Sequence, residues 1–214
     1  MTRLAFIHTG AVVIPTISSL AAAHLPGVET HHLLDDKIVA DLGRDAEGSG
    51  VRDRLRDLVH VAQRGGAKAV MFSCSSISGF AAGLQTELGL PVLRIDEAMA
   101  DEAVRLGQRV AVLATLPTTL TPTVALLRER AEAAGRSVEV AEVLIEGAFE
   151  AVSGGDRDRH DALVAEAITA RAGQVDVVVL AQASMASAAE TVSTDVPVLT
   201  SPELGVRRAA SLLT

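Results

Sequence analysis

The sequence predicts an α/β protein with two pseudo-symmetric lobes, each a mainly parallel sheet flanked by helices. Three observations lead to this prediction. Short apolar runs of strand length alternate with helix-patterned segments, which is typical of repeated βαβ units. The 214 residues are 49% hydrophobic but only 2% aromatic, so Ala, Val, Leu and Ile must form the core, as they do in sheets covered by helices on both faces. The order of these segments is also repeated within the chain.

The predicted strands are short apolar runs, at 4–8, 69–73, 91–95, 109–114, 175–181 and 197–200, and "THH" at 30–32 lies in a further strand. A helix is predicted over 51–64, where apolar residues recur at helical spacing until "GG" ends the pattern. Similar helices are predicted over 118–134 and 156–172, each followed by a glycine. These segments are expected to be crossover helices between parallel strands.

The internal repeat has a shift of about 107 residues. "LAFIHTGAVVIPT" at 4–16 matches "VAVLATLPTTLTPT" at 110–123, and "KAVMFSCSSIS" at 68–78 matches "VDVVVLAQASMAS" at 175–187. Strand, helix, strand, long helix, strand, helix and strand therefore follow each other twice. This order predicts a first lobe formed by 1–95 plus 201–214 and a second lobe formed by 96–200.

The charge and composition disfavour several classes of partner. The net charge of -8 leaves no basic surplus for binding to nucleic acid or to an anionic membrane surface. No apolar run reaches the roughly 18 residues of a membrane span, and the N-terminal run is shorter than that of a signal peptide. The one cysteine allows no intramolecular disulfide, which agrees with a reducing compartment. We expect a cytoplasmic protein.

Small polar residues follow the predicted strands and are the candidate site residues. Parallel sheets bind ligands beyond the carboxyl ends of their strands, so two facing lobes would place these residues around one cleft. They are Thr9 and Gly10, the stretch 74–76, the stretch 115–119 and the stretch 182–184.

Cys74, in "AVMFSCSSISG", has two interpretations. It follows an apolar run, and a lone cysteine in that place is most often a small buried hydrophobe. It also precedes a helix-like segment, where the N–H groups and the helix dipole would stabilise a thiolate, and where Ser75 and Ser76 add hydroxyl donors. The residues alone leave both interpretations open.

The other polar residues are less specific. Thr9, Thr115, Thr118 and Thr119 could cap helices as well as bind a ligand. The six histidines show no metal-ligand spacing, so no metal site is expected. The sequence also has no G-x-S-x-G elbow and no G-x-G-x-x-G after a strand, which argues against a serine hydrolase and against dinucleotide binding.

The half-repeats, the Cys-Ser-Ser at 74–76, the "ATLPTT" at 114–119 and the "LAQASM" at 180–185 resemble the aspartate/glutamate/hydantoin racemase superfamily, which includes arylmalonate decarboxylase and maleate isomerase. The resemblance covers nearly the whole chain. It implies a site without cofactor, in which racemases use two cysteines on opposite faces of the substrate's α-carbon. One thiolate removes a proton, and the other thiol returns it.

On this chain the resemblance assigns the first catalytic cysteine to Cys74 and the position of the second to Gln182, whose amide has no useful acidity. It implies that the substrate carboxylate or the developing oxyanion is bound by Thr9, Ser75, Ser76, Thr115, Thr118 and Ser184.

The resemblance favours an isomerase that acts on a small carboxylate by proton transfer at the α-carbon with a single thiol. The alternatives are a one-cysteine decarboxylase or lyase, with "AVVIP" at 11–15 or Phe149 as an apolar wall, and a carboxylate-binding protein without turnover. Dimers are common among the relatives, so a homodimer is compatible with the resemblance.

Overall fold

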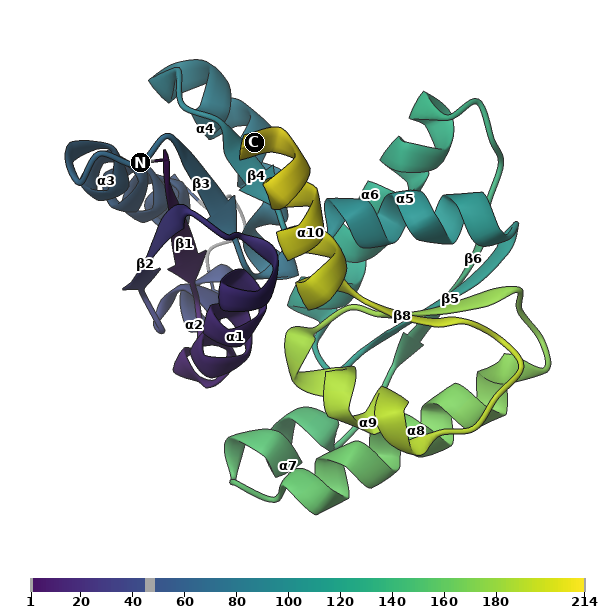
Figure 1. Cartoon of the computed structure of the whole chain (residues 1–214). Helices are drawn as coiled ribbons and strands as arrows, with labels where there is room; N and C mark the ends of the chain where they lie inside the picture. Colours follow the sequence, from purple (N-terminus) through teal and green to yellow (C-terminus); the bar gives the residue numbers. More distant parts are fainter. Residues whose placement is uncertain (1, 45–48, 214) are drawn as a thin grey trace. The chain divides into compact units, whose positions relative to one another are not determined.

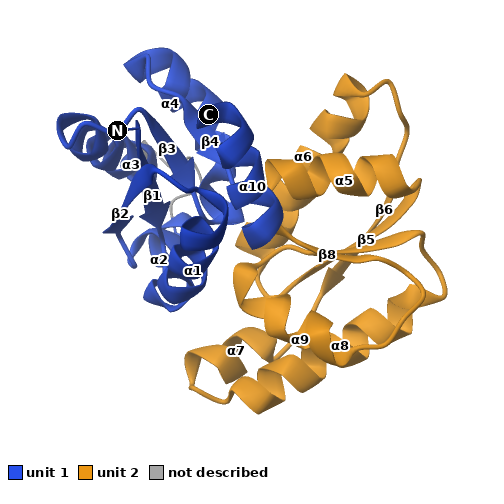
Figure 2. Ribbon diagram, in the orientation of Figure 1, with its two compact units in different colours: residues 1–95, 202–214 blue, residues 96–201 orange. Residues whose placement is uncertain are grey.

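The computed structural model describes residues 2–44 and 49–213, in which strands and helices alternate along the chain (Figure 1). The chain divides into two compact units, Met1–Ile95 with Pro202–Thr214, and Asp96–Ser201 (Figure 2). Each unit contains one four-stranded parallel sheet, with the order β2-β1-β3-β4 in the first and β6-β5-β7-β8 in the second. The prediction of an α/β fold with two parallel sheets is therefore confirmed.

The first unit contains the first four strands and their connecting helices. Its elements are β1 (Thr2–His8), the 3-10 helix η1 (Ala11–Val13), α1 (Ile14–His24), β2 (Val28–Leu34), α2 (Ile38–Leu42), α3 (Ser49–Arg64), β3 (Ala69–Phe72), the 3-10 helix η2 (Ser75–Phe80), α4 (Ala81–Leu88), β4 (Val92–Arg94) and the C-terminal α10 (Ser201–Leu213).

The second unit repeats this order. Its elements are α5 (Glu97–Leu106), β5 (Arg109–Ala114), α6 (Pro117–Ala133), β6 (Glu139–Leu144), α7 (Ala148–Ser153), α8 (Arg157–Ala172), β7 (Val177–Leu180), the 3-10 helix η3 (Ala183–Met185), α9 (Ala186–Thr191) and β8 (Val198–Thr200).

The strand register aligns the two halves residue by residue. Ile7 of β1 pairs with Phe72 of β3, and Leu113 of β5 pairs with Leu180 of β7 at the same place in the second sheet. The two sheets thus have the same strand order and the same pairing at their centres. The internal repeat seen in the sequence is a structural repeat.

The central strands are buried on both faces, which explains why they read as continuous apolar runs. In the first unit, one hydrophobic cluster joins β1 and β3 to α3 and α4, and a second cluster joins them to α1 and α10. In the second unit, β5 and β7 pack against α8 and α9. The sheets are thus held rigidly, and the residues that follow the central strands start from fixed positions.

The helix that follows the last strand of each sheet belongs to the other unit. Helix α5 follows β4 in the chain but belongs to the second unit, while α10 follows β8 and belongs to the first unit, in whose blue colour Figure 2 draws it. Gly205 of α10 lies against the main chain of Ile95, and a Cβ at this position would overlap the carbonyl oxygen of Ile95. The close approach of α10 to the first sheet therefore requires glycine.

The outer strands β2 and β6 were harder to predict from the sequence. The sequence "EVAEVL" of β6 was not among the predicted strands, because this edge strand is only half buried and carries two glutamates. Strand β2 has the same edge position and contains the "THH" that was predicted to lie in a strand. Two central strands are also shorter than their apolar runs: β3 spans 69–72 rather than 69–73, and β7 spans 177–180 rather than 175–181.

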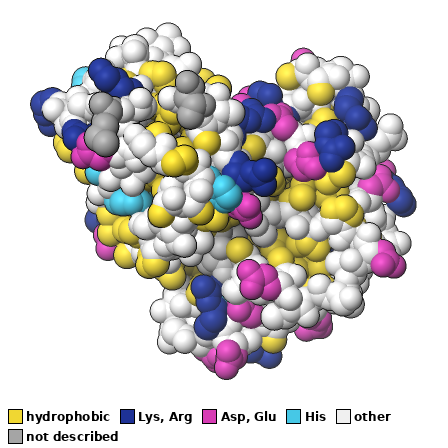
Figure 3. Space-filling model, in the orientation of Figure 1, with side chains coloured by type: hydrophobic (Ala, Val, Ile, Leu, Met, Phe, Trp, Pro, Cys, Tyr) yellow, Lys and Arg dark blue, Asp and Glu magenta, His cyan; other side chains and the backbone are white. Residues whose placement is uncertain are grey.

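Charged side chains of both signs lie next to each other on the face drawn in Figure 3. Ion pairs such as Arg105–Glu102 and Arg109–Asp176, both at 2.6 Å, join side chains of opposite charge. Among the described residues, no helix has the length and apolar character needed to cross a membrane.

Candidate active site

Cys74 lies at the carboxyl end of β3, two residues beyond Phe72. Its backbone is extended, with φ -133° and ψ 124°, and it is the N-cap residue of η2. The carbonyl oxygen of Cys74 accepts a hydrogen bond from the Ile77 amide at 3.2 Å. The side chain packs against the hydrophobic cluster under α3 and α4, yet it is only partly buried. The Cys74 side chain therefore contacts the core, as expected for a small hydrophobe, and it keeps the solvent access that a reactive thiolate requires.

Gln182 occupies the same place in the second unit. It is the N-cap residue of η3, with φ -123° and ψ 138°, and its carbonyl oxygen accepts a hydrogen bond from the Met185 amide at 3.0 Å. Cys74 and Gln182 thus share strand position, backbone conformation and the turn that follows. Gln182 thus has the same place in the second unit as Cys74 has in the first.

The Gln182 amide forms two hydrogen bonds with Thr115, which follows β5. The Thr115 amide donates to Oε1 of Gln182 at 2.7 Å, and Nε2 of Gln182 donates to Oγ1 of Thr115 at 2.7 Å. This amide clamp joins the ends of two neighbouring strands. An amide has two N–H donors and Thr115 keeps its own hydroxyl proton, so each group retains one donor for a ligand.

Thr118 lies in the first turn of α6, where the N-cap residue is Leu116 and provides no side-chain cap. Its Oγ1 is buried and has no hydrogen-bond partner among the described residues. A buried hydroxyl without a partner costs about 1–3 kcal/mol, so a polar ligand would be stabilised here. The first turn of α6 also contains no acidic residue that would offset the positive end of the helix dipole.

The remaining predicted residues follow the same strand ends. Thr9, Ser75 and Ser76 are buried at the Cys74 edge of the first sheet. Ser184 lies in η3 of the second unit, and its carbonyl oxygen accepts a hydrogen bond from Arg157 at 2.8 Å. The structure thus places Thr9, Cys74, Ser75 and Ser76 together in the first unit, and Thr115, Thr118, Gln182 and Ser184 together in the second.

The sequence analysis missed a polar cluster beside Cys74. His8 ends β1, and its Nδ1 lies 2.7 Å from Oγ of Ser73, the residue before Cys74. Nε2 of His8 lies 2.8 Å from Nδ1 of His32 on β2, and the two rings stack with their centroids 5.0 Å apart. Nε2 of His32 lies 3.2 Å from Oγ of Ser18 on α1. A histidine at the end of an apolar strand was the only sequence signal for this cluster.

Burial and, to a lesser degree, the neighbouring His32 lower the pKa of His8 from 6.5 to about 4. Burial and then His31 lower the pKa of His32. Both rings are therefore neutral at pH 7, and each can donate at one nitrogen and accept at the other. No cluster of three metal-ligating side chains occurs within 2–44 and 49–213.

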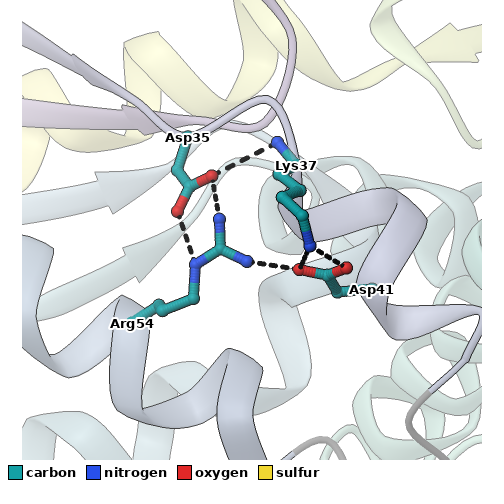
Figure 4. A network of polar contacts seen from close by, with 4 residues as sticks. All are labelled: Asp35, Lys37, Asp41 and Arg54. Atoms are coloured by element: carbon teal, nitrogen blue, oxygen red, sulfur yellow. Dashed lines mark hydrogen bonds and ion pairs between the residues drawn. The ribbon is translucent and has the colours of Figure 1, made fainter.

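A network of charged residues holds the loop after β2 (Figure 4). The Asp35 amide donates to the His8 carbonyl oxygen at 3.0 Å, which joins this loop to the end of β1. Nε of Arg54 donates to the Asp35 carboxylate at 2.8 Å, and the guanidinium also contacts Asp41. Lys37 donates to Asp41 as well. Since these charges pair with each other, the network has a structural role beside the candidate site.

Comparison with known proteins places this architecture in a family. The family described as Asp/Glu/Hydantoin racemase matches residues 7–209. The chain belongs to this family. A comparison with curated proteins gave no match.

Solved structures show the same fold at low sequence identity. Glutamate racemase isoform RacE1 from Bacillus anthracis has a TM-score of 0.75 and 17% identity, with 99% of this chain and 81% of that chain covered. Allantoin racemase from Klebsiella pneumoniae has a TM-score of 0.67 and 22% identity, with 99% and 87% covered. A glycine-to-cysteine variant of arylmalonate decarboxylase has a TM-score of 0.62 and 18% identity, with 99% and 92% covered. The relatives thus include racemases and a decarboxylase.

Proposed function

We propose that the protein is an isomerase that moves a proton at the α-carbon of a small carboxylate, without a cofactor, and that Cys74 is its acid–base group. The observation that carries the proposal is the position of Cys74. The chain's only cysteine is partly exposed at the end of a central strand, at the N-cap of η2. The fixed strand end and the family support its use as the thiolate that removes the proton, while a substitute second acid gives a proton to the opposite face of the α-carbon.

The polar residues near Cys74 have a defined part in this proposal. Removing a proton next to a carboxylate places negative charge on the carboxylate oxygens. Hydrogen-bond donors held in place before the reaction lower the free energy of that charge. In the first unit we assign this role to Thr9, Ser75 and Ser76.

In the second unit, we propose that the substrate carboxylate is bound by Thr115, Thr118, Gln182 and Ser184. The amide clamp leaves one donor on Gln182 and one on Thr115, and the Thr118 hydroxyl is buried without a partner among the described residues. Gln182 thus acts by binding and orientation. In this proposal Cys74 is the only thiol, and no second cysteine returns the proton.

A decarboxylase with one thiol is the second candidate, favoured by two exposed apolar side chains. Val12, four residues beyond the end of β1, is 61% exposed, and Phe149, five residues beyond the end of β6, is 36% exposed. Apolar surroundings destabilise a carboxylate and so favour its loss as carbon dioxide. In this reaction the Cys74 thiol would give its proton to the carbanion that remains.

One experiment separates these functions. The protein is incubated in deuterium oxide with amino acids, hydroxy acids, hydantoins and substituted malonates, and NMR follows α-deuteration and release of carbon dioxide. Deuteration with inversion of the α-carbon and without carbon dioxide supports the isomerase, and carbon dioxide from a malonate supports the decarboxylase. Cys74→Ala should abolish either reaction, and Cys74→Ser should lower its rate about 100-fold or more. Binding of a carboxylate with neither reaction would overturn both enzymes in favour of a binding protein.

A further inference from the structure

The cluster of Ser18, His32, His8 and Ser73 forms one unbroken chain of hydrogen bonds from the surface to the buried end of β3. Ser18 is exposed, His32 is half buried, and His8 and Ser73 are buried. Beyond Ser73, the chain ends on the carbonyl oxygen of Ile7, to which the Ser73 hydroxyl donates at 3.2 Å. Every neighbouring pair in the chain lies within 3.2 Å.

The chain can have either of two directions. In the first, the Ser18 hydroxyl donates to Nε2 of His32, Nδ1–H of His32 donates to Nε2 of His8, Nδ1–H of His8 donates to Ser73, and Ser73 donates to Ile7. In the second, Ser73 donates to Nδ1 of His8, Nε2–H of His8 donates to Nδ1 of His32, and Nε2–H of His32 donates to Ser18. Both directions satisfy every ring nitrogen, because a neutral imidazole is a donor at one nitrogen and an acceptor at the other.

The second unit lacks this chain. By the register of the two sheets, Ala114 is equivalent to His8 and Ala181 to Ser73. Phe6 pairs with His32 in the first sheet, and Val112 pairs with Glu142 in the second. Alanine at both positions is therefore compatible with this sheet, and the histidine and serine occur only in the unit that contains the cysteine. Packing alone does not explain the asymmetry.

We propose that Ser18, His32, His8 and Ser73 form a proton relay that connects the Cys74 edge of the first sheet with solvent. The use of the relay in catalysis rests on the proposed function, in which a single thiol must exchange its proton after each transfer. His31 does not belong to the relay. Its ring lies near Gly65, and the hydrogen bonds of the relay join His8, His32 and Ser18 instead. The low pKa values of His8 and His32 keep both rings neutral and able to switch between tautomers.

Each passage of the relay conserves protons. Ser18 gives its hydroxyl proton to Nε2 of His32 and takes a proton from water in its place. The Nδ1 proton of His32 then moves to Nε2 of His8, and the Nδ1 proton of His8 moves to Oγ of Ser73. Ser73 releases its own hydroxyl proton to the Cys74 thiolate of the proposed function, which becomes a thiol, and keeps the proton that it received from His8. No bond between heavy atoms forms or breaks, and the chain then has the opposite direction. Transfer of a proton outward, from the Cys74 thiol to solvent, restores the first direction, so the chain can carry a proton either way.

The relay is tested without substrate, on the full chain with ¹⁵N-labelled histidine. NMR measures how fast the ring N–H of His8 exchanges with water and which tautomers the two rings adopt. We expect fast exchange of the buried His8 ring, far faster than that of the Phe6 amide in the same strand, and tautomers that interconvert in both rings. Exchange as slow as that of the Phe6 amide, or a single fixed tautomer in either ring, would overturn the relay even if no variant folds.

Two variants sharpen this test. His32→Gln keeps an amide that can hydrogen-bond to His8 but cannot pass a proton, and it should slow the exchange of the His8 ring about tenfold or more. Ser73→Ala removes the inner end of the relay but leaves the route from solvent through Ser18 and His32, so it should leave the exchange of the His8 ring fast. An unchanged rate in His32→Gln would refute the relay.

Failure of the relay and failure of the proposed function give different results. Cys74→Ala should leave the exchange of the His8 ring unchanged, because the thiol is not part of the chain, while it abolishes α-deuteration. In the deuteration assay, His32→Gln should lower the Cys74-dependent rate about tenfold. Suppose that the His8 ring exchanges fast in the wild type but the deuteration rate of His32→Gln is unchanged. The chain would then conduct protons without serving Cys74, and its catalytic use would be overturned.

Discussion

Replacing Gln182 with methionine should destabilise the second unit, because methionine has a similar length but lacks the amide. Both hydrogen bonds of the amide clamp, each 2.7 Å long, are lost. Their net contribution is about 1 kcal/mol each, and the buried amide of Thr115, only 6% exposed, is left without this acceptor at a further cost. We expect the free energy of unfolding to fall by about 2–4 kcal/mol.

The matched variant is Gln182→Glu, which keeps an oxygen for the Thr115 amide and a second oxygen that accepts the Thr115 hydroxyl proton. Its free energy of unfolding should lie within about 1 kcal/mol of the wild type, because both contacts are retained. The chain has no Trp and no Tyr, so urea unfolding is followed by far-UV circular dichroism. Equal midpoints for the wild type and Gln182→Met, or an equal loss in both variants, would refute this account of the clamp.

Two further predictions concern stability. Because the pKa of His8 is about 4 in the folded protein and 6.5 for a solvent-exposed histidine, the unfolded chain binds the proton first as the pH falls. Stability should decrease from pH 6.5 to pH 4 by about 3 kcal/mol, and urea midpoints of His8→Phe should lack most of this decrease; an equal decrease in the variant would contradict the assignment to His8. Hydrogen bonds from Arg109 and Gln108 lower the pKa of Asp176 to about 2, so the stability that this carboxylate contributes is lost only as the pH falls from about 3.8 to about 2. Gly205→Ala should destabilise by about 1–3 kcal/mol through overlap with Ile95, whereas Gly83→Ala, in open space within α4, should be neutral or stabilising by up to about 1 kcal/mol; equal melting temperatures of the two variants would argue against the close approach of α10.

The fold could be predicted well from the sequence because its main signals are local. Central parallel strands are buried on both faces, so β5 reads as a continuous apolar run and begins and ends at the predicted residues 109 and 114. The edge strand β6 escaped prediction because half of its residues meet solvent and its pattern is mixed. The repeat compensated in part, since the order of elements in the first half predicts a strand at that place.

The candidate site was predictable in its positions but not in its contacts. The repeat placed Cys74 and Gln182 at equivalent strand ends, and the structure gives both the same backbone conformation. The bonds of Gln182 to Thr115 could not be foreseen, because they join residues 67 positions apart in the sequence. His8 and His32 were missed for a similar reason, since a histidine pair across two strands has no characteristic spacing in the sequence.

The dependence of α-deuteration on the Cys74 sulfur tests the central claim most directly. In deuterium oxide, the wild type should deuterate the α-carbon of at least one carboxylate of the panel, and Cys74→Ser should lower the rate about 100-fold or more, because a hydroxyl is a far weaker acid than a thiol and supplies almost no anionic base at neutral pH. The serine variant should keep the free energy of unfolding of the wild type to within about 1 kcal/mol. A serine variant that is folded and still deuterates at the wild-type rate would contradict the claim that Cys74 transfers the proton.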